Sequence, residues 1–412
     1  MNDKRLPAPP SRIQSAYLAQ MLHTLWPEPA TVTRRRLLAN AAAEHYDLVV
    51  LPHDRRPKLV LPRRPWRVTA AAIRNYKMYA TGLDRLQVLA VAAAVRFGAA
   101  ELLPGQLRIT GSSGDIVDYL SKALGQRCYV CIYIGPPRAV QKPVLQILSG
   151  TGQTLGFAKI GVDDTSRHLV RRETQNLRFL STANLRTVTV PAVMHSGQWA
   201  GHEVLAQQAL LRTGRGYVDG STLEAAMYEI AHAEGTASRA LERSSYWSRL
   251  HQRIEDLPRS PLGELIRAVR DEVGATSGSV SVPFGCWHGD WGPWNMTQSE
   301  GRLLVWDWEH FEHDVPLGFD AIHHQVQSAV LSGSAPESAF VDARCAAQRL
   351  LSPFGRVEPA LAQVIVQLYT LEISTRYLSD GEPDRDGTIM GRLDWLKSTW
   401  PLLRVHAPCS GG

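Results

Sequence analysis

The chain has few cysteines, no long hydrophobic run and no leader-like start. Five cysteines are spread over 412 residues without the spacing of a disulfide framework, which predicts a reducing environment and a cytoplasmic location. No apolar stretch reaches the ~18 residues of a membrane helix, because Arg96 interrupts the best candidate, residues 88–103. The first residues carry charge with no apolar core behind them, so no signal peptide is expected. These absences predict a globular, cytoplasmic protein.

Basic charge is concentrated in the first third of the chain. Residues 1–120 hold 17 Lys and Arg against 9 Asp and Glu, whereas the remainder holds 28 against 30. The basic runs lie at 34–36, 55–58 and 63–67. Such a segment attracts an anionic partner, for example nucleic acid or an acidic substrate, or it is simply a solvated face. Both interpretations remain open from the sequence.

Hydrophobic periodicity predicts three parts. Residues 1–125 are interpreted as a basic, mostly helical accessory region, with a proline-rich linker at 52–65. Residues 126–210 contain short runs rich in Val, Ile and aromatic residues, which predict strands, and one amphipathic helix. Residues 211–405 have mostly helical spacing. A small antiparallel sheet with one helix, followed by a large helical part, predicts a two-lobed α+β fold.

The helices and strands expected in these parts are specific. In the accessory region the spacing predicts helices at 13–25, 34–46, 69–79 and 83–103. In the second part it predicts strands at 129–134, 144–148 and 155–160 and a helix from about 166 to 180. The third part is interrupted by an irregular stretch at 284–311.

The irregular stretch carries the polar residues that indicate chemistry. Asp290 and Asn295 stand five residues apart on a loop with Gly and Pro, so both side chains can converge. Asp307 ends the apolar run of residues 303–306, which places a carboxylate at the end of a buried strand. Oxygen ligands from two segments suit Mg²⁺, and a further carboxylate is then free to orient an attacking hydroxyl. This is the layout of a kinase catalytic loop followed by a metal-binding Asp.

At this point the sequence resembles a known family. His288-Gly289-Asp290 with Asn295, followed by Asp307-Trp308-Glu309, is similar to the motifs of the aminoglycoside phosphotransferase/choline kinase-like family, which has the protein-kinase fold. The resemblance covers roughly residues 125–400. It implies a two-lobed, protein-kinase-like fold with the basic region as an N-terminal extension. The glycine-rich phosphate loop of kinases is absent, and residues 135–143 take its place.

A kinase also needs a Lys on its third strand and a Glu on the following helix. Lys159 is the single charge in the apolar strand of residues 155–160, and Glu173 stands fourteen positions later. On the predicted helix, Glu173 falls in an apolar stripe, where a carboxylate is costly unless it meets a cation. We therefore predict that Lys159 and Glu173 form an ion pair.

The resemblance implies an ATP- and Mg²⁺-dependent phosphotransferase with an alcohol group as acceptor. Lys159, held by Glu173, is expected to position the nucleotide phosphates, and Asn295 and Asp307 are expected to hold Mg²⁺. Asp290 is expected to orient the acceptor hydroxyl and take its proton. The acceptor is a sugar, amino sugar or small alcohol, or Ser/Thr of a peptide. The charge distribution favours an anionic small molecule or a peptide with an acidic leader over a polycation.

Two alternative functions remain. One is a pseudokinase that binds nucleotide and regulates a protein partner through residues 1–125. The other is a nucleic-acid-binding protein, which the basic runs with interleaved aromatic residues support without any recognised motif. Neither a membrane nor a nucleic acid is the expected partner.

Several neighbouring residues are expected to support the site. His288 is predicted to support the loop, and Asp320 is predicted to accept hydrogen bonds from backbone N–H groups. Glu309 is predicted either to assist the metal or to contact a metal ligand or solvent instead. Cys128 and Cys131 should point to opposite faces of one strand, which excludes a redox pair. The spacing of four histidines matches no zinc signature; they are His310, His313, His323 and His324. The tryptophans of residues 287–308 are expected to pack the loop.

Overall fold

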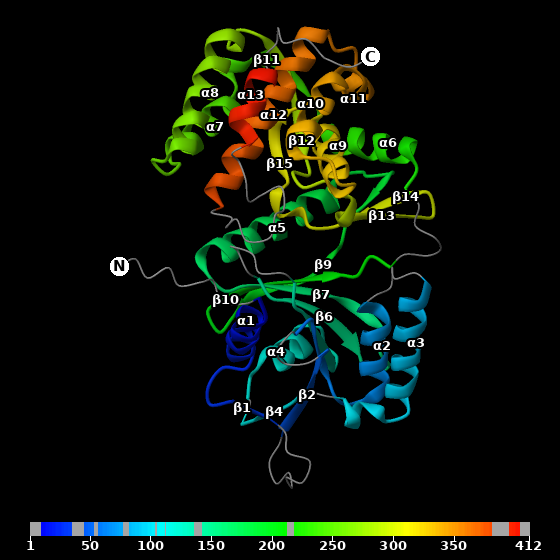
Figure 1. Cartoon of the computed structure of the whole chain (residues 1–412). Helices are drawn as coiled ribbons and strands as arrows, with labels where there is room; N and C mark the ends of the chain where they lie inside the picture. Colours follow the sequence, from blue (N-terminus) through cyan, green and yellow to red (C-terminus); the bar gives the residue numbers. More distant parts are fainter. Residues whose placement is uncertain are drawn as a thin grey trace. The chain divides into compact units, whose positions relative to one another are not determined.

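The computed structural model describes residues 10–34, 45–52, 57–76, 82–103, 105–111, 113–135, 142–211, 218–380 and 395–403. The chain divides into two compact units. Unit 1 comprises Met1–Arg171 with Ala192–Ala209, and unit 2 comprises Arg172–Pro191 with Leu210–Gly412. Both units contain helices and strands, so the predicted mixed α+β class is confirmed (Figure 1). None of the described helices combines the length and apolar character needed to cross a bilayer.

Unit 1 is built on one nine-stranded antiparallel sheet with the strand order β1-β4-β2-β3-β5-β6-β7-β10-β9. The strands are β1 (Thr31–Arg34), β2 (His45–Leu51), β3 (Leu59–Pro62), β4 (Gln106–Thr110), β5 (Cys128–Tyr133), β6 (Val144–Ser149), β7 (Thr154–Gly161), β9 (Val193–Trp199) and β10 (His202–Gln208). The three strands predicted from β-branched and aromatic runs are present as β5, β6 and β7, with each boundary within one residue of the prediction.

Helices cover both faces of this sheet (Figure 1). One face packs against α1 (Pro10–Leu25) and α4 (Ile116–Ala123), and the other packs against α2 (Trp66–Tyr76) and α3 (Gly82–Arg96). Alternate residues of a strand therefore enter different cores. Cys128 lies in the first core and Cys131 in the second, which confirms that this pair cannot act as a dithiol.

The accessory region is not separate from the small sheet, which corrects the predicted boundary at residue 125. Its strands β1 to β4 extend the sheet, and β3 pairs directly with β5. The linker predicted at 52–65 contains β3, and the helix predicted at 34–46 is wrong at both ends, where β1 ends and β2 begins. Residues 35–44 lie outside the described residues. The sequence did not predict β3, because this strand has only four residues and lies in a stretch rich in proline and arginine. All four residues are buried, so the strand also lacks the alternation of polar and apolar residues that indicates a strand.

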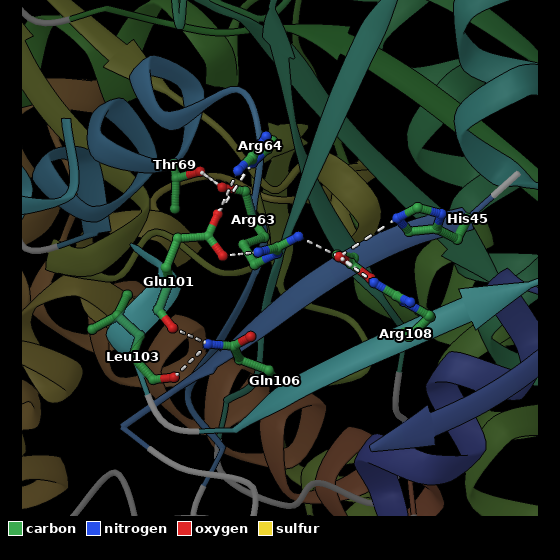
Figure 2. A network of polar contacts seen from close by, with 9 residues as sticks. His45, Arg63, Arg64, Thr69, Glu101, Leu103, Gln106 and Arg108 are labelled. Atoms are coloured by element: carbon green, nitrogen blue, oxygen red, sulfur yellow. Dashed lines mark hydrogen bonds and ion pairs between the residues drawn. The ribbon is translucent and has the colours of Figure 1, made fainter. Parts of the chain in front are cut away.

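Ion pairs stabilise the part of the sheet that β1 to β4 form (Figure 2). Asp47 on β2 accepts hydrogen bonds from Arg63 and, at 2.9 Å, from Arg108 Nε on β4. Glu101, in the short 3-10 helix η1 (Ala99–Leu102), accepts from Arg63 and from Arg64 Nη2 at 2.9 Å. In the basic run at 63–67, Arg63 is thus buried inside this network, and Arg64 is an exposed partner of Glu101.

Unit 2 is mostly helical and contains two three-stranded sheets, with the orders β11-β12-β15 and β13-β14-β8. Its strands are β8 (Val188–Thr189), β11 (Ala237–Ala240), β12 (Ser281–Trp287), β13 (Met296–Ser299), β14 (Arg302–Val305) and β15 (Glu312–Pro316). Its helices are α6 (Gly220–Ala231), α7 (Ser245–Glu255), α8 (Pro261–Ser277), α9 (Phe319–Leu331), α10 (Pro336–Cys345), α11 (Ala347–Leu351), α12 (Pro359–Ser379) and α13 (Trp395–Leu403). The helix α5 (Asp164–Thr182) contributes residues to both units.

One large hydrophobic core supports unit 2. It joins β12 and β15 to α7, α8, α9, α12 and α13. The helix α12 is central, because residues on all of its sides are buried. The strand β12 therefore leaves a rigid core immediately before the predicted catalytic loop.

Candidate functional site

A hairpin brings two of the predicted site residues together. β13 and β14 pair in antiparallel with Met296 opposite Val305. Beyond that pair, the Trp306 N–H donates to the Asn295 carbonyl at 3.0 Å. Asn295 and Asp307 therefore leave the same end of one hairpin, one from each strand. The short 3-10 helix η3 (Pro293–Asn295) turns the chain into this hairpin.

The Asp290 carboxylate is held by two polar side chains. Asn295 Nδ2 donates to Asp290 Oδ2 at 2.8 Å and to the Asp290 carbonyl at 2.9 Å. On the other carboxylate oxygen, His323 Nε2 lies 3.3 Å from Oδ1. Because its amide nitrogen is used in this way, Asn295 has only Oδ1 to offer a cation. The Asp290 side chain remains 20% exposed, so it is fixed in orientation and still reachable by a substrate.

The surroundings keep Asp290 ionised. Burial raises its pKa, but the hydrogen bond from His323 and the charge of Arg376 hold the pKa below its usual value. Burial also lowers the pKa of His323. The neutral imidazole donates from Nε2 to Asp290 and accepts at Nδ1 from the Tyr369 hydroxyl, 3.0 Å away. A carboxylate in this state can accept a proton.

His288 and Asp320 anchor the loop, as the sequence predicted. Asp320 accepts from the backbone N–H groups of His288, at 2.7 Å, and Gly289, at 3.2 Å. The His288 ring accepts at Nδ1 from the Asp290 N–H and donates from Nε2 to the Trp306 carbonyl, each at 3.1 Å. Burial lowers the pKa of His288 to about 4. With both nitrogens used and the ring neutral, His288 is a structural residue and not the base.

Gly289 allows the loop to approach the segment that follows Asp307. Its φ is 85°, and a Cβ at this position would lie 2.4 Å from the His310 carbonyl oxygen. The Gly289 carbonyl accepts a hydrogen bond of 2.6 Å from Arg376 Nη1. Any larger residue at 289 would therefore separate the two halves of the site.

A second group of carboxylates surrounds Asp307. Asp307 adopts the left-handed conformation, with φ 72°, which is rare outside glycine. One oxygen from each of Glu173, Asp307 and Glu309 lies within 4.8 Å of the others. Asn176, one turn after Glu173 on α5, donates to the Trp308 carbonyl at 2.8 Å and ties the helix to this segment. Three carboxylates at this spacing offer the hard oxygen ligands that suit Mg²⁺.

The predicted Lys159–Glu173 pair involves elements of different units. Lys159 lies on β7 opposite Val144 and Leu205 and is 6% exposed. Glu173 lies on α5 and is fully buried. The strand and the helix were predicted correctly, and the ion pair stays a prediction. The sequence did not predict that Glu173 lies beside Asp307 and Glu309.

The tryptophans pack the loop at three positions. Trp287, Trp291 and Trp308 are buried, and the Trp308 ring lies edge-on to His288 with 4.5 Å between centroids. Trp308 Nε1 donates to the Val305 carbonyl at 2.9 Å. Trp294 differs, because 45% of it is exposed. Most of residues 135–143, the expected phosphate loop, lie outside the described residues.

With this geometry established, the chain was compared with known proteins. No protein-family profile matches it, and no curated protein matches it. Solved structures do match. The aminoglycoside phosphotransferase APH(4)-Ia in complex with ADP and hygromycin B is 13% identical, with 71% of this chain and 99% of that chain covered and a TM-score of 0.45. The choline kinase LicA from Streptococcus pneumoniae is 14% identical, with 63% and 89% covered and a TM-score of 0.38.

A third match is the GDP complex of an aminoglycoside 2′-phosphotransferase-IIIa variant, which is 14% identical, with 64% and 87% covered and a TM-score of 0.39. By their names, these three structures are two aminoglycoside phosphotransferases and one choline kinase.

Two residues of the site were missed from the sequence. His323 was weighed only as one of four possible metal ligands, although its position three residues after Asp320 places it on the same face of α9. Arg376 is the second residue. It is the one basic residue of the mostly apolar helix α12, which also contains the buried Glu372, and a charge in such a setting is a signal for a buried partner.

Proposed function

We propose that the chain is an ATP- and Mg²⁺-dependent phosphotransferase that moves the γ-phosphate to a hydroxyl of a small molecule or of a peptide Ser/Thr. The observation that carries the proposal is the Asp290–Asn295 hydrogen bond at the base of the hairpin that ends in Asp307. This arrangement brings together the ionised carboxylate of Asp290, the amide oxygen of Asn295 and the carboxylate of Asp307. Phosphoryl transfer by kinases uses groups of these three kinds.

The roles follow from the chemistry of each side chain. Asp290, held by Asn295 and His323, orients the acceptor hydroxyl and takes its proton. Asn295 Oδ1 and the Asp307 carboxylate would hold Mg²⁺, with Glu309 beside them. When bound, Mg²⁺ would neutralise phosphate charge and orient the transferred group. Removing Asp290 should therefore abolish transfer while nucleotide binding persists.

Lys159 and Glu173 are proposed to position the nucleotide phosphates as an ion pair. A double-mutant cycle on kcat/KM tests this pairing, with Lys159→Ala, Glu173→Ala and both together. If the residues act as a pair, the double variant loses less than the sum of the single losses. Strict additivity would show that Glu173 acts through its other neighbours, Asp307 and Glu309.

The acceptor is proposed to be neutral or anionic. Residues beyond 120 hold 28 basic and 30 acidic side chains, which is not the acidic surface that a polycationic acceptor would favour. The N-terminal basic runs could add attraction for an acidic peptide or a protein partner, but Arg63 and Arg64 are already paired with carboxylates. Salt screens attraction between exposed charges. The KM for an anionic acceptor should therefore rise with salt only if basic residues other than Arg63 and Arg64 contact that acceptor.

The decisive experiment is an acceptor screen with γ-labelled ATP over sugars, amino sugars, small alcohols and peptides, with Mg²⁺ or with EDTA. Mg²⁺-dependent labelling of one class is the expected result. Nucleotide binding without turnover on any acceptor, including water, would instead support the pseudokinase. A salt-dependent affinity for DNA or RNA without nucleotide binding would support the nucleic-acid-binding alternative.

A further inference from the structure

A cysteine, a histidine and a glutamate meet at an irregularity between β12 and β15, on the strand that leads to the catalytic loop. Gly285 pairs with Val315 and Trp287 pairs with Glu312, so the single residue Cys286 stands opposite two residues, 313 and 314. Asp314, the second of the two, has a φ of 55°. Such a bulge redirects a side chain that would otherwise alternate to the far face, and here it brings His313 to Cys286.

Glu234 reaches the same place from the end of α6. A Cβ on Gly285 would lie 2.2 Å from the Ala231 carbonyl oxygen, so the absence of a side chain lets the helix end pack directly on β12. The following turn carries Glu234, whose Oε2 lies 2.6 Å from His313 Nδ1. Cys286 Sγ lies 3.7 Å from the same nitrogen. The ligand atoms of all three residues lie within 4.8 Å of one another.

We propose that Cys286, His313 and Glu234 form a binding site for a borderline-soft divalent cation such as Zn²⁺, with the fourth ligand position open to water. Sulfur, imidazole nitrogen and carboxylate oxygen are the three ligand types that Zn²⁺ takes, and three protein ligands leave one position for solvent. The Mg²⁺ proposed above uses oxygen ligands, so the two sites differ in the class of cation that they select.

The distances fit this cation after a small movement of the carboxylate. With Zn–S near 2.3 Å and Zn–N near 2.0–2.1 Å, a tetrahedral site separates sulfur and nitrogen by about 3.6 Å, close to the 3.7 Å observed here. The nitrogen and oxygen ligands would be about 3.4 Å apart, so Glu234 must withdraw by about 1 Å. It is free to do so, because 46% of its side chain is exposed.

The surroundings fix the imidazole. Binding of the cation would release the thiol proton of Cys286 to solvent as the metal–sulfur bond forms. The rings of Phe179 and Phe311 lie edge-on to His313 at 4.8 and 4.9 Å, which fixes the imidazole. The two half-exposed ligands provide the entry path.

A nucleophilic cysteine is a poorer interpretation of this group. In a catalytic relay the acid and the nucleophile use opposite nitrogens of the histidine. Here Glu234 and Cys286 both contact Nδ1, so His313 cannot take a proton from the thiol at one nitrogen while the carboxylate orients the other.

The test is a Co²⁺ titration of the full-length, EDTA-dialysed protein, because Co²⁺ reports thiolate ligation by charge-transfer absorption in the near ultraviolet. We expect one equivalent of Co²⁺ to produce the band and one equivalent of Zn²⁺ to abolish it. Cys286→Ser should remove the band, whereas Cys345→Ser, at an exposed cysteine, should leave it unchanged. If Cys286→Ser fails to fold, Glu234→Gln serves instead, because it alters an exposed side chain and should weaken Zn²⁺ binding by about tenfold or more.

Three outcomes would overturn the proposal. They are no charge-transfer band in the folded wild-type protein, a band that persists in Cys286→Ser, and Zn²⁺ affinity unchanged in Glu234→Gln. Any of these would show that Glu234 and His313 form an ordinary ion pair beside a buried thiol. None of the readouts depends on phosphotransferase activity, so the result stands apart from the proposed function.

Discussion

Two polar networks, one in each unit, treat their carboxylates in opposite ways. In unit 1, Asp47 forms ion pairs with Arg63 and Arg108, and all three side chains are largely buried. In unit 2, Asp290 is held by an amide and by a neutral imidazole. The pKa of each carboxyl lies below its usual value, but two guanidinium groups neutralise the charge of Asp47, whereas the side chains that hydrogen-bond to Asp290 are neutral and leave its charge available to an acceptor hydroxyl. The first arrangement stabilises the fold, and the second supports chemistry.

Arg376 adds to this contrast, because it is a charged residue near Asp290, whereas Asn295 and His323 make the hydrogen bonds to the Asp290 carboxylate. The arginine donates to the Gly289 carbonyl and lies over the rings of Trp287 and Tyr377. Its charge lowers the pKa of Asp290 from a distance. The network in unit 2 thus keeps Asp290 ionised and leaves its oxygens available to a substrate.

Asp307→Ala should produce a large loss of activity, since it removes a proposed metal ligand. We expect kcat/KM for Mg²⁺-dependent transfer to fall by at least about 10²–10³-fold, because charge neutralisation supplies much of the acceleration in phosphoryl transfer. Steady-state kinetics over a range of Mg²⁺ concentrations measure it. Activity that excess Mg²⁺ restores fully would assign Asp307 a lesser role than the comparison requires.

Arg63→Ala and Arg64→Ala compare a buried and an exposed partner of the same carboxylate, Glu101. Arg63 is 5% exposed and also pairs with Asp47, whereas the Arg64 side chain is 64% exposed. Removing Arg63 should lower the free energy of unfolding by about 3–5 kcal/mol, and removing Arg64 by less than about 1 kcal/mol. Urea unfolding measures both. Equal losses would mean that the network of unit 1 does not act through burial.

The pH dependence of stability should separate His288 from Asp320. The folded pKa of His288, about 4, lies below its usual 6.5, so the unfolded chain binds more protons between these values and stability falls as the pH drops through this window. Burial raises the pKa of Asp320 to about 7, which has the opposite sign: its contribution to stability grows as the pH drops from 7.

Urea unfolding at pH 7 and pH 5 tests this opposition. Relative to the wild type, His288→Gln should remove a loss of roughly 2 kcal/mol on going from pH 7 to pH 5. Asp320→Asn should make the loss steeper, because the compensating carboxyl is gone. A pH response that is the same in all three proteins would contradict the assigned protonation states.

The sequence predicted the local elements better than the contacts between distant segments, and the roles of the site residues stay predictions. Asp290, Asn295 and Asp307 could be placed together because glycine, proline and an apolar strand constrain their neighbours within 20 residues. His323 and Arg376 could not, since their contacts with the loop depend on how α9 and α12 pack in the core. The hydrophobic pattern within a short stretch of sequence does not indicate which residues of distant helices meet.

The N-terminal region was interpreted less well for a related physical reason. Its helices at 13–25 and 69–79 were predicted and correspond to α1 and α2 within three residues, whereas the helix predicted at 83–103 comprises α3, which ends at Arg96, and the short helix η1. Its strands were missed: β1, β3 and β4 have only four or five residues, and the seven-residue β2 begins inside the helix predicted at 34–46. Strands this short become stable only by pairing with distant partners, as β3 does with β5.

The most direct test of the account is to neutralise one carboxylate in each network and to measure both activity and stability. Asp290→Asn and Asp47→Asn are matched substitutions. The account predicts that Asp290→Asn retains the melting temperature and nucleotide binding while kcat for phosphoryl transfer falls by about 10²–10⁴-fold. It predicts that Asp47→Asn lowers the melting temperature while the folded protein keeps its kcat. Turnover of Asp290→Asn within about tenfold of the wild type, a barrier change of only ~1.4 kcal/mol, would contradict the central claim.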